Sequence, residues 1–309
     1  MKALEALLVD ATAGDPITGL KWTHKTLRNL SQELQKRGFA IERDTVNRLL
    51  RELKYVQRTN RKRLSKTQDP DRDRQMRYVA RQRRAFLKAG FPVISVDTKK
   101  RELVGNFKNA GRTWRRGRLD VLENDFPSEA DVVAIPYGIY DVGRNEALVV
   151  VGTSHQTPEF AITAIRRWWL LHGRRQYRPL TEWLIEADCG GANGNDYCAW
   201  KWGLQQLADE FGVTITVTHL PTSASKWNPI EHRLFCFVSK NWAGQPLVDY
   251  ETVLKFIRTT TTDTGLRCWA CLDTAEYATG RKISELQRSQ INLKPHRVLP
   301  KWNYTIEPH

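Results

Sequence analysis

The order in which short apolar runs and longer amphipathic segments follow Pro92 constrains the fold most. Before that proline the apolar residues recur at helical spacing, and after it β-branched runs typical of strands appear. We expect strands at residues 93–98, 102–107, 132–142, 147–153, 181–188 and 213–219, and helices at 157–172, 195–211 and 229–241. A group of strands followed by alternating helices and strands predicts an antiparallel meander that continues into parallel crossovers.

This order predicts a mixed α/β sheet flanked by helices, which is the arrangement of the RNase H-like fold of the retroviral-integrase superfamily. In such a sheet Asp97 lies on the central first strand, Asp188 ends the strand at residues 181–188 and Glu231 begins the last helix. We assign residues 91–245 to this catalytic domain and expect residues 246–309 to form a C-terminal extension that packs on it.

Asp97, Asp188 and Glu231 are candidate metal ligands. Asp97 and Asp188 each close an apolar run, and Glu231 is the third helical residue if Asn228 is the N-cap and Pro229 the first position. The helix dipole favours an ionised acid there. Each acid alone is better explained as a turn or capping residue. Together, in a basic chain with this order of strands, they favour a site for two Mg²⁺ ions about 3.5–4 Å apart.

The charge of the chain predicts a polyanionic partner. Its 309 residues include 49 Lys and Arg against 34 Asp and Glu, which gives a net charge of +15, and DNA or RNA is the first candidate. No run of 18 apolar residues is present, and the start is too charged for a signal peptide. The five cysteines fit reduced thiols, and Cys268 and Cys271 alone are too few for structural zinc. We expect a cytoplasmic protein.

Residues 1–66 are expected to be an all-α helix-turn-helix DNA-binding domain with a basic arm. Helices are predicted at 2–12, 24–37 and 45–53, with Gly38 ending the second and Asp44 capping the third. The third helix turns four polar residues outward: Arg43, Asn47, Arg48 and Arg51. The alternative is a three-helix bundle with a solvated basic face.

A basic stretch without apolar periodicity follows this domain. It contains Arg58, Arg61, Lys62 and Arg63, and we interpret it as an arm that lies on phosphates or in a minor groove. Residues 67–90 are then predicted to hold a long connecting helix.

Two loops flank the candidate site. Gly190, Gly191 and Gly194 lack the spacing of a phosphate-binding loop and predict a tight turn. Before the last helix, Lys226 is placed to hold a phosphate and Trp227 to stack on an unpaired base. The alternative for Trp227 is a core residue that fixes the start of the helix.

Several segments together resemble a known family. They are residues 93–100, 188–194 and 225–232, joined by 99–111, 136–141 and 302–305. They resemble the DDE transposases of bacterial insertion sequences, most closely the Rhodopirellula-type group, with distant similarity to the mariner-like superfamily.

The resemblance implies that Asp97, Asp188 and Glu231 are the catalytic triad and that Mg²⁺ or Mn²⁺ is the cofactor. It implies cleavage at element ends and strand transfer by a 3′-hydroxyl. The expected partners are double-stranded DNA with terminal inverted repeats, target DNA and a second copy of the chain. Because family members usually carry more helical sequence upstream, we expect a truncated copy. The alternatives are a structure-specific nuclease of the same fold and an inactive or truncated transposase that only binds DNA.

Overall fold

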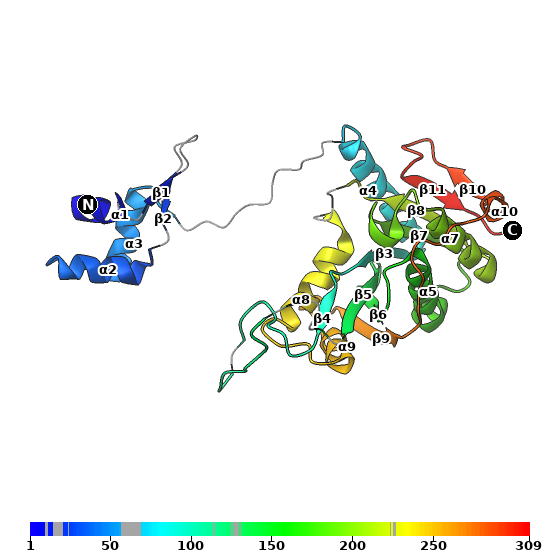
Figure 1. The fold of residues 1–309 in the computed structure, drawn as a ribbon. Coiled ribbons are helices and arrows are strands. Elements are labelled where there is room, and N and C mark those ends of the chain that lie inside the picture. Colours follow the sequence, from blue (N-terminus) through cyan, green and yellow to red (C-terminus); the bar gives the residue numbers. More distant parts are fainter. Residues whose placement is uncertain are drawn as a thin grey trace. The chain divides into compact units, whose positions relative to one another are not determined.

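The computed structural model divides the chain into two compact units, Met1–Leu64 and Ser65–His309 (Figure 1). The described residues are 1–9, 12–14, 21–23, 25–56, 69–113, 115–124, 126, 130, 132–222, 224 and 227–309. Among them, no helix is long and apolar enough to cross a membrane.

The first unit contains three helices and an antiparallel strand pair. The elements are α1 (Lys2–Val9), β1 (Thr12–Gly14), β2 (Lys21–Thr23), α2 (Leu27–Lys36) and α3 (Arg43–Glu52). Its core is built from leucines of α1 and α2 and one valine of α3: Leu4, Leu7, Leu8, Leu30, Leu34 and Val46. Helices are thus present where residues 24–37 and 45–53 are predicted to be helical, whereas the strand pair is not predicted from the sequence.

The predicted end of α2 is confirmed, whereas the predicted cap of α3 is not. Gly38 adopts a φ of +87° after the end of α2, and the Phe39 N–H donates to the Leu34 carbonyl at 3.1 Å, as expected for a glycine-terminated helix. The prediction for α3 is wrong: the helix begins one residue before Asp44, after Glu42, whose side chain makes no capping hydrogen bond. Asp44 instead lies in the first turn, where the helix dipole stabilises an acid.

The second unit is built on a mixed sheet of nine strands in the described part of the chain. The strands are β3 (Val93–Thr98), β4 (Glu102–Val104), β5 (Val132–Asp141), β6 (Glu146–Gly152), β7 (Glu182–Ala187), β8 (Thr214–His219), β9 (Arg267–Asp273), β10 (Leu293–Pro295) and β11 (Asn303–Ile306). Their order is β10-β11-β8-β7-β3-β5-β6-β9, with β4 on β5.

The inner five strands have the RNase H-like topology. β3, β5 and β6 form the antiparallel meander, while β7 pairs parallel with β3 and β8 pairs parallel with β7. Parallel neighbours need a crossover connection, and helical segments supply it between β6 and β7 and between β7 and β8. The predicted order of strands and the predicted fold class are confirmed.

Helices cover both faces of this sheet (Figure 1). One face packs against α5 (Pro158–Trp168), the π-helical turn η2 (Trp169–Gly173) and α7 (Cys198–Phe211). The other packs against the π-helical turn η5 (Glu231–Phe235), α8 (Cys236–Asn241) and α9 (Tyr250–Arg258). The helix predicted to end at residue 172 continues through α6 (Arg174–Tyr177), and Trp168 and Trp169 are buried against Trp183.

The long helix α4 (Arg72–Ala89) lies on the sheet face opposite α5 and α7. In β7, Ile185 and Ala187 point into the core beneath α5 and α7, so the alternating Glu186 points to the other face. Arg83 of α4 donates to both oxygens of Glu186, at 2.7 and 2.6 Å. The predicted connecting helix is thus part of the second unit.

Residues 246–309, expected to pack on the catalytic domain, supply strands to the sheet itself. β9 pairs parallel with β6, and β11 pairs antiparallel with β8, so this segment completes both sides of the sheet. Unpaired backbone groups on β6 and β8 would otherwise form open edges. The segment is consequently an integral part of the fold.

Candidate active site

Asp97 and Asp188 lie level with each other on neighbouring strands. Val96 is the register partner of Ala187 in the parallel pair β3–β7, and the two aspartates are the next residues along. Val96 and Ala187 belong to the core beneath α5 and α7. Because side chains alternate along a strand, both aspartates fall on the opposite face, which α4 and η5 cover.

A buried hydrogen-bond chain holds Asp97. Its Oδ1 accepts from the Thr98 N–H at 2.7 Å, and its Oδ2 accepts from Asn228 Nδ2 at 3.0 Å. The Oδ1 of Asn228 accepts from the Ser95 hydroxyl at 2.7 Å, and the Ser95 oxygen accepts from the Ile230 N–H at 3.3 Å. Asn228 is therefore not the side-chain cap that the sequence predicts, since Ser95 receives a helix N–H and Asn228 connects the helix start to Asp97.

Asp188 is held by the glycine turn that follows it. Its pKa is raised to about 6 by burial, while hydrogen bonds from the Gly190 backbone and the Asn193 side chain oppose that shift. Asn193 also accepts from the Tyr137 hydroxyl at 2.7 Å. Among the described residues, Asp188 Oδ1 is buried and has no hydrogen-bond partner. One oxygen of the carboxylate is thus available to a ligand.

The predicted tight turn after Asp188 is confirmed. Residues Gly191–Asn193 form a 3₁₀ turn, and Gly191 has a φ of +58°. A Cβ on Gly191 would lie 2.5 Å from Nε2 of Gln156. The positive φ favours glycine at this position, whereas the contact with the end of the flexible Gln156 side chain can be relieved by moving that side chain.

Glu231 shares the electrostatic environment of the two aspartates. Burial raises the pKa of Asp97 to about 8, and the negative charges of Asp188 and Glu231 add to the shift. The pKa of Glu231 is raised by burial and lowered by the charges of Lys99 and His232. Three acids from β3, the end of β7 and η5 thus come within electrostatic range of one another.

The donor set fits a hard divalent cation. No group of three His, Cys, Asp or Glu side chains within the described ranges is gathered closely enough to form a complete metal cage. Mg²⁺ seldom uses such a cage, because it keeps several waters and takes one or two carboxylates together with substrate phosphate. The Asp188 Oδ1, which has no hydrogen-bond partner within the described ranges, is an oxygen donor of the kind that such an ion takes.

Five of the ten predicted DNA contacts fall within the described residues. Arg43, Arg48 and Arg51 are exposed on α3, and Asn47 is half-buried. Trp227 is 48% exposed and the Arg72 guanidinium lies 4.7 Å from its ring centroid, so the interpretation of Trp227 as a core residue is wrong. The remaining predicted contacts lie outside the described residues: Arg58, Arg61, Lys62, Arg63 and Lys226.

The roles of four residues that support the acids are not predicted from the sequence: Ser95, Lys99, Tyr137 and Asn193. Ser95 has a recognisable signal, because it precedes Asp97 by two residues and so shares its face of the strand. Lys99 is nearly buried over the Trp242 ring, 4.6 Å from its centroid, and pairs with Glu102. The partners of Tyr137 and Asn193 depend on contacts between distant segments and have no local signal.

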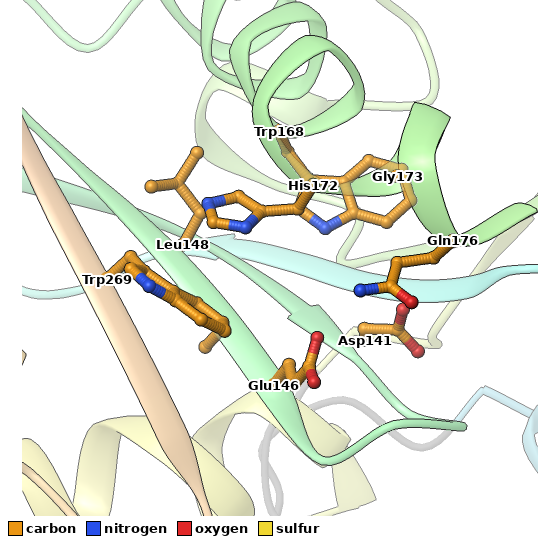
Figure 2. A pocket seen from close by; sticks show the side chains of 9 residues that line it. Asp141, Glu146, Leu148, Trp168, His172, Gly173, Gln176 and Trp269 are labelled. Carbon is orange, nitrogen blue, oxygen red and sulfur yellow. The ribbon is translucent and has the colours of Figure 1, made fainter.

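A small pocket near the amino end of β3 offers no comparable site. Figure 2 shows its lining, which includes Asp141, Glu146, His172 and Trp269. Asp141 accepts from the Tyr177 hydroxyl at 2.7 Å, and His172 stacks on Trp269 with ring centroids 4.4 Å apart. These polar groups serve the local structure, and Asp141 pairs with Ile94 at the start of β3, far along the strand from Asp97.

The fold and the site define an RNase H-like domain with carboxylates in β3, directly after β7 and in η5. Residues 3–308 match the family described as Rhodopirellula transposase DDE domain. The chain belongs to this family, which confirms the resemblance drawn from the sequence. No curated protein matches.

Solved structures of Mos1 transposase are similar to the chain at low identity. The paired-end complex with left transposon end is 16% identical, with 82% of this chain and 68% of that chain covered and a TM-score of 0.44. The Mos1 strand transfer complex is 14% identical, with the same coverages and a TM-score of 0.45. The Mos1 mariner paired-end complex with Mn is 17% identical, covering 83% and 69%, with a TM-score of 0.44.

Proposed function

We propose that this transposase-family protein cuts DNA at the ends of a mobile element and joins the freed 3′-hydroxyl to target DNA. Asp97, Asp188 and Glu231 are the proposed catalytic triad. The observation that carries the proposal is the level placement of Asp97 and Asp188 on one face of the sheet, with Glu231 within their electrostatic range. Family membership and the net charge of +15 support DNA as the substrate.

The triad would hold two divalent ions, Mg²⁺ or Mn²⁺, which when bound activate the attacking oxygen and stabilise the leaving oxygen. The protein supplies the positioning. Asn228 orients Asp97 through its 3.0 Å hydrogen bond, and the turn at Gly190 and Asn193 orients Asp188. Lys99 favours the ionised form of Glu231, which a metal ligand requires.

In this proposal the first unit recognises terminal inverted repeats. Arg43, Arg48 and Arg51 lie exposed on α3 with Asn47 beside them, as a recognition helix requires. The basic arm, a second copy of the chain and target DNA complete the proposed assembly.

The test uses the purified full chain with Mn²⁺ or Mg²⁺ and a duplex that ends in the terminal repeat flanking its gene. We expect strand cleavage followed by joining to a target plasmid. Asp97→Asn and Glu231→Gln should abolish cleavage and leave DNA binding nearly intact. Asp263→Asn, an exposed acid of equal charge change, is the control and should cleave like the parent.

The alternatives give different results in the same assay. Cleavage without joining would indicate a nuclease, and binding without cleavage would indicate an inactive transposase. Cleavage by Asp97→Asn at the rate of the parent would show that the triad is assigned incorrectly.

A further inference from the structure

Helix α4 carries a row of exposed basic side chains. Arg74, Arg77, Arg81, Arg84 and Lys88 are all exposed, and their spacing of three and four residues places them on one face of the helix. We name these five residues the α4 stripe. At 1.5 Å per residue it extends for about 21 Å. Two acids lie at the start of the helix: the N-cap Asp71, 3.8 Å from Arg74, and the exposed Asp73 in the first turn.

The opposite face of α4 fixes the direction in which the stripe points. Gln75 is fully buried and donates to the His219 carbonyl at 2.8 Å, and Arg83 makes its paired bonds to Glu186. Val79 packs against Leu220. These contacts hold α4 against the sheet, so the α4 stripe faces away from the protein.

The stripe begins beside the candidate site. Gln75 contacts the carbonyl of His219, and the Nδ1 of His219 lies 2.8 Å from the carbonyl oxygen of Asp188. The far end of α4 leads through Gly90 into the start of β3, whose other end carries Asp97. The α4 stripe therefore runs from the carboxyl ends of β3 and β7, where the triad lies, toward the amino ends of these strands.

We propose that the α4 stripe binds the phosphate backbone of the duplex that is cut at the triad. Successive phosphates of one DNA strand are about 3.4 Å apart along the helix axis, so a row of about 21 Å spans roughly six of them. In the part of the chain that the structure describes, these side chains have no buried acidic partner. The Arg81 guanidinium lies 5.0 Å over the Tyr78 ring, and Arg77 and Arg84 donate Nε to backbone carbonyls one turn earlier. This inference rests on the proposed function in taking DNA as the substrate.

The test measures DNA affinity of the full chain against salt concentration, without divalent metal. The probe is a labelled duplex of about 30 base pairs with no terminal repeat, because backbone binding is independent of sequence. The variant replaces Arg77, Arg81 and Arg84 by Gln. If three phosphate contacts are lost, the slope of log affinity against log salt should become shallower by about 2.7. The corresponding Arg→Lys variant should keep the slope of the parent.

A control of equal charge change isolates the position of the charges. Arg174, Arg175 and Arg178 are also exposed in the second unit, and their replacement by Gln should leave the slope near that of the parent. An unchanged slope in the stripe variant, or an equal decrease in both, would overturn the proposal. Altered sedimentation of the stripe variant with unchanged DNA binding would instead identify a second copy of the chain as the partner.

This assay separates the inference from the proposed chemistry. Because binding is measured without metal, the slope does not depend on cleavage. If the parent cleaves DNA and the stripe variant keeps the full slope, only the inference about α4 fails. If the parent binds through the stripe and never cleaves, only the proposed reaction fails.

Discussion

Replacing Arg83 by Met should strongly destabilise the second unit. Glu186 is fully buried and Arg83, with 27% of its side chain exposed, contacts both of its oxygens. Removing one partner of a buried ion pair typically costs about 3–5 kcal/mol, because an uncompensated charge stays in the core. For a unit of this size each kcal/mol lowers the Tm by about 2–4 °C. The Tm of the second unit should therefore fall by roughly 6–20 °C.

The pH dependence of this loss has a definite sign. Burial already raises the pKa of Glu186 above its ordinary value of 4.5, against the hydrogen bonds and charge of Arg83. Without Arg83 the folded-state pKa should rise further. A raised folded pKa gives stability that is present below 4.5 and lost as the pH rises, with a slope of up to about 1.4 kcal/mol per unit. The variant should thus approach the parent near pH 5 and differ most above pH 7.

The assay is urea unfolding followed by circular dichroism at several pH values. The double variant Arg83→Met with Glu186→Leu is the control, and it should recover most of the lost stability because no charge remains buried. A difference between Arg83→Met and the parent that stays below about 1 kcal/mol and does not change with pH would refute the reasoning.

Three further predictions concern the site. Asn228→Ala removes the donor to Asp97, and we expect a loss of about 1–3 kcal/mol in stability together with slower cleavage in a gel assay; cleavage as fast as the parent's would exclude a positioning role. Bound protons compete with metal, so Mn²⁺ affinity measured by calorimetry should rise as the pH increases through about 6 for Asp188 and about 8 for Asp97, whereas affinity independent of pH would contradict this. Trp227→Ala should leave the Tm nearly unchanged, since the ring is 48% exposed beside Arg72, and should weaken binding of single-stranded DNA ends by about 1–3 kcal/mol; a large drop in Tm with unchanged end binding would show that the ring only packs.

The sequence predicts the parts of this protein that depend on local pattern. The apolar runs that end at Asp97 and Asp188 become β3 and β7, and Gly38 ends α2 as expected. The alternation of side chains along β3 and β7 is also a local property, and it places both aspartates on one face of the sheet.

The parts that the sequence does not reveal depend on distant contacts. β9 is defined by its pairing with β6, across more than a hundred residues, and its residues show no clear alternation of burial. Asn228 looks like a helix cap because the sequence does not show that Ser95 and Asp97 lie beside it. Secondary-structure propensity depends on residues that are close in the sequence, whereas the roles of β9 and Asn228 are set by tertiary packing.

The central claim, that one metal site is shared by β3, β7 and η5, is tested most directly by iron-mediated cleavage of the polypeptide. Fe²⁺ placed in the site with ascorbate and peroxide produces short-lived radicals that cut the backbone near the bound ion. We predict three cleavage positions, close to Asp97, Asp188 and Glu231, which excess Mg²⁺ suppresses and Asp97→Asn abolishes together. Cleavage at other positions, or cleavage near only one of the three acids, would contradict a shared site.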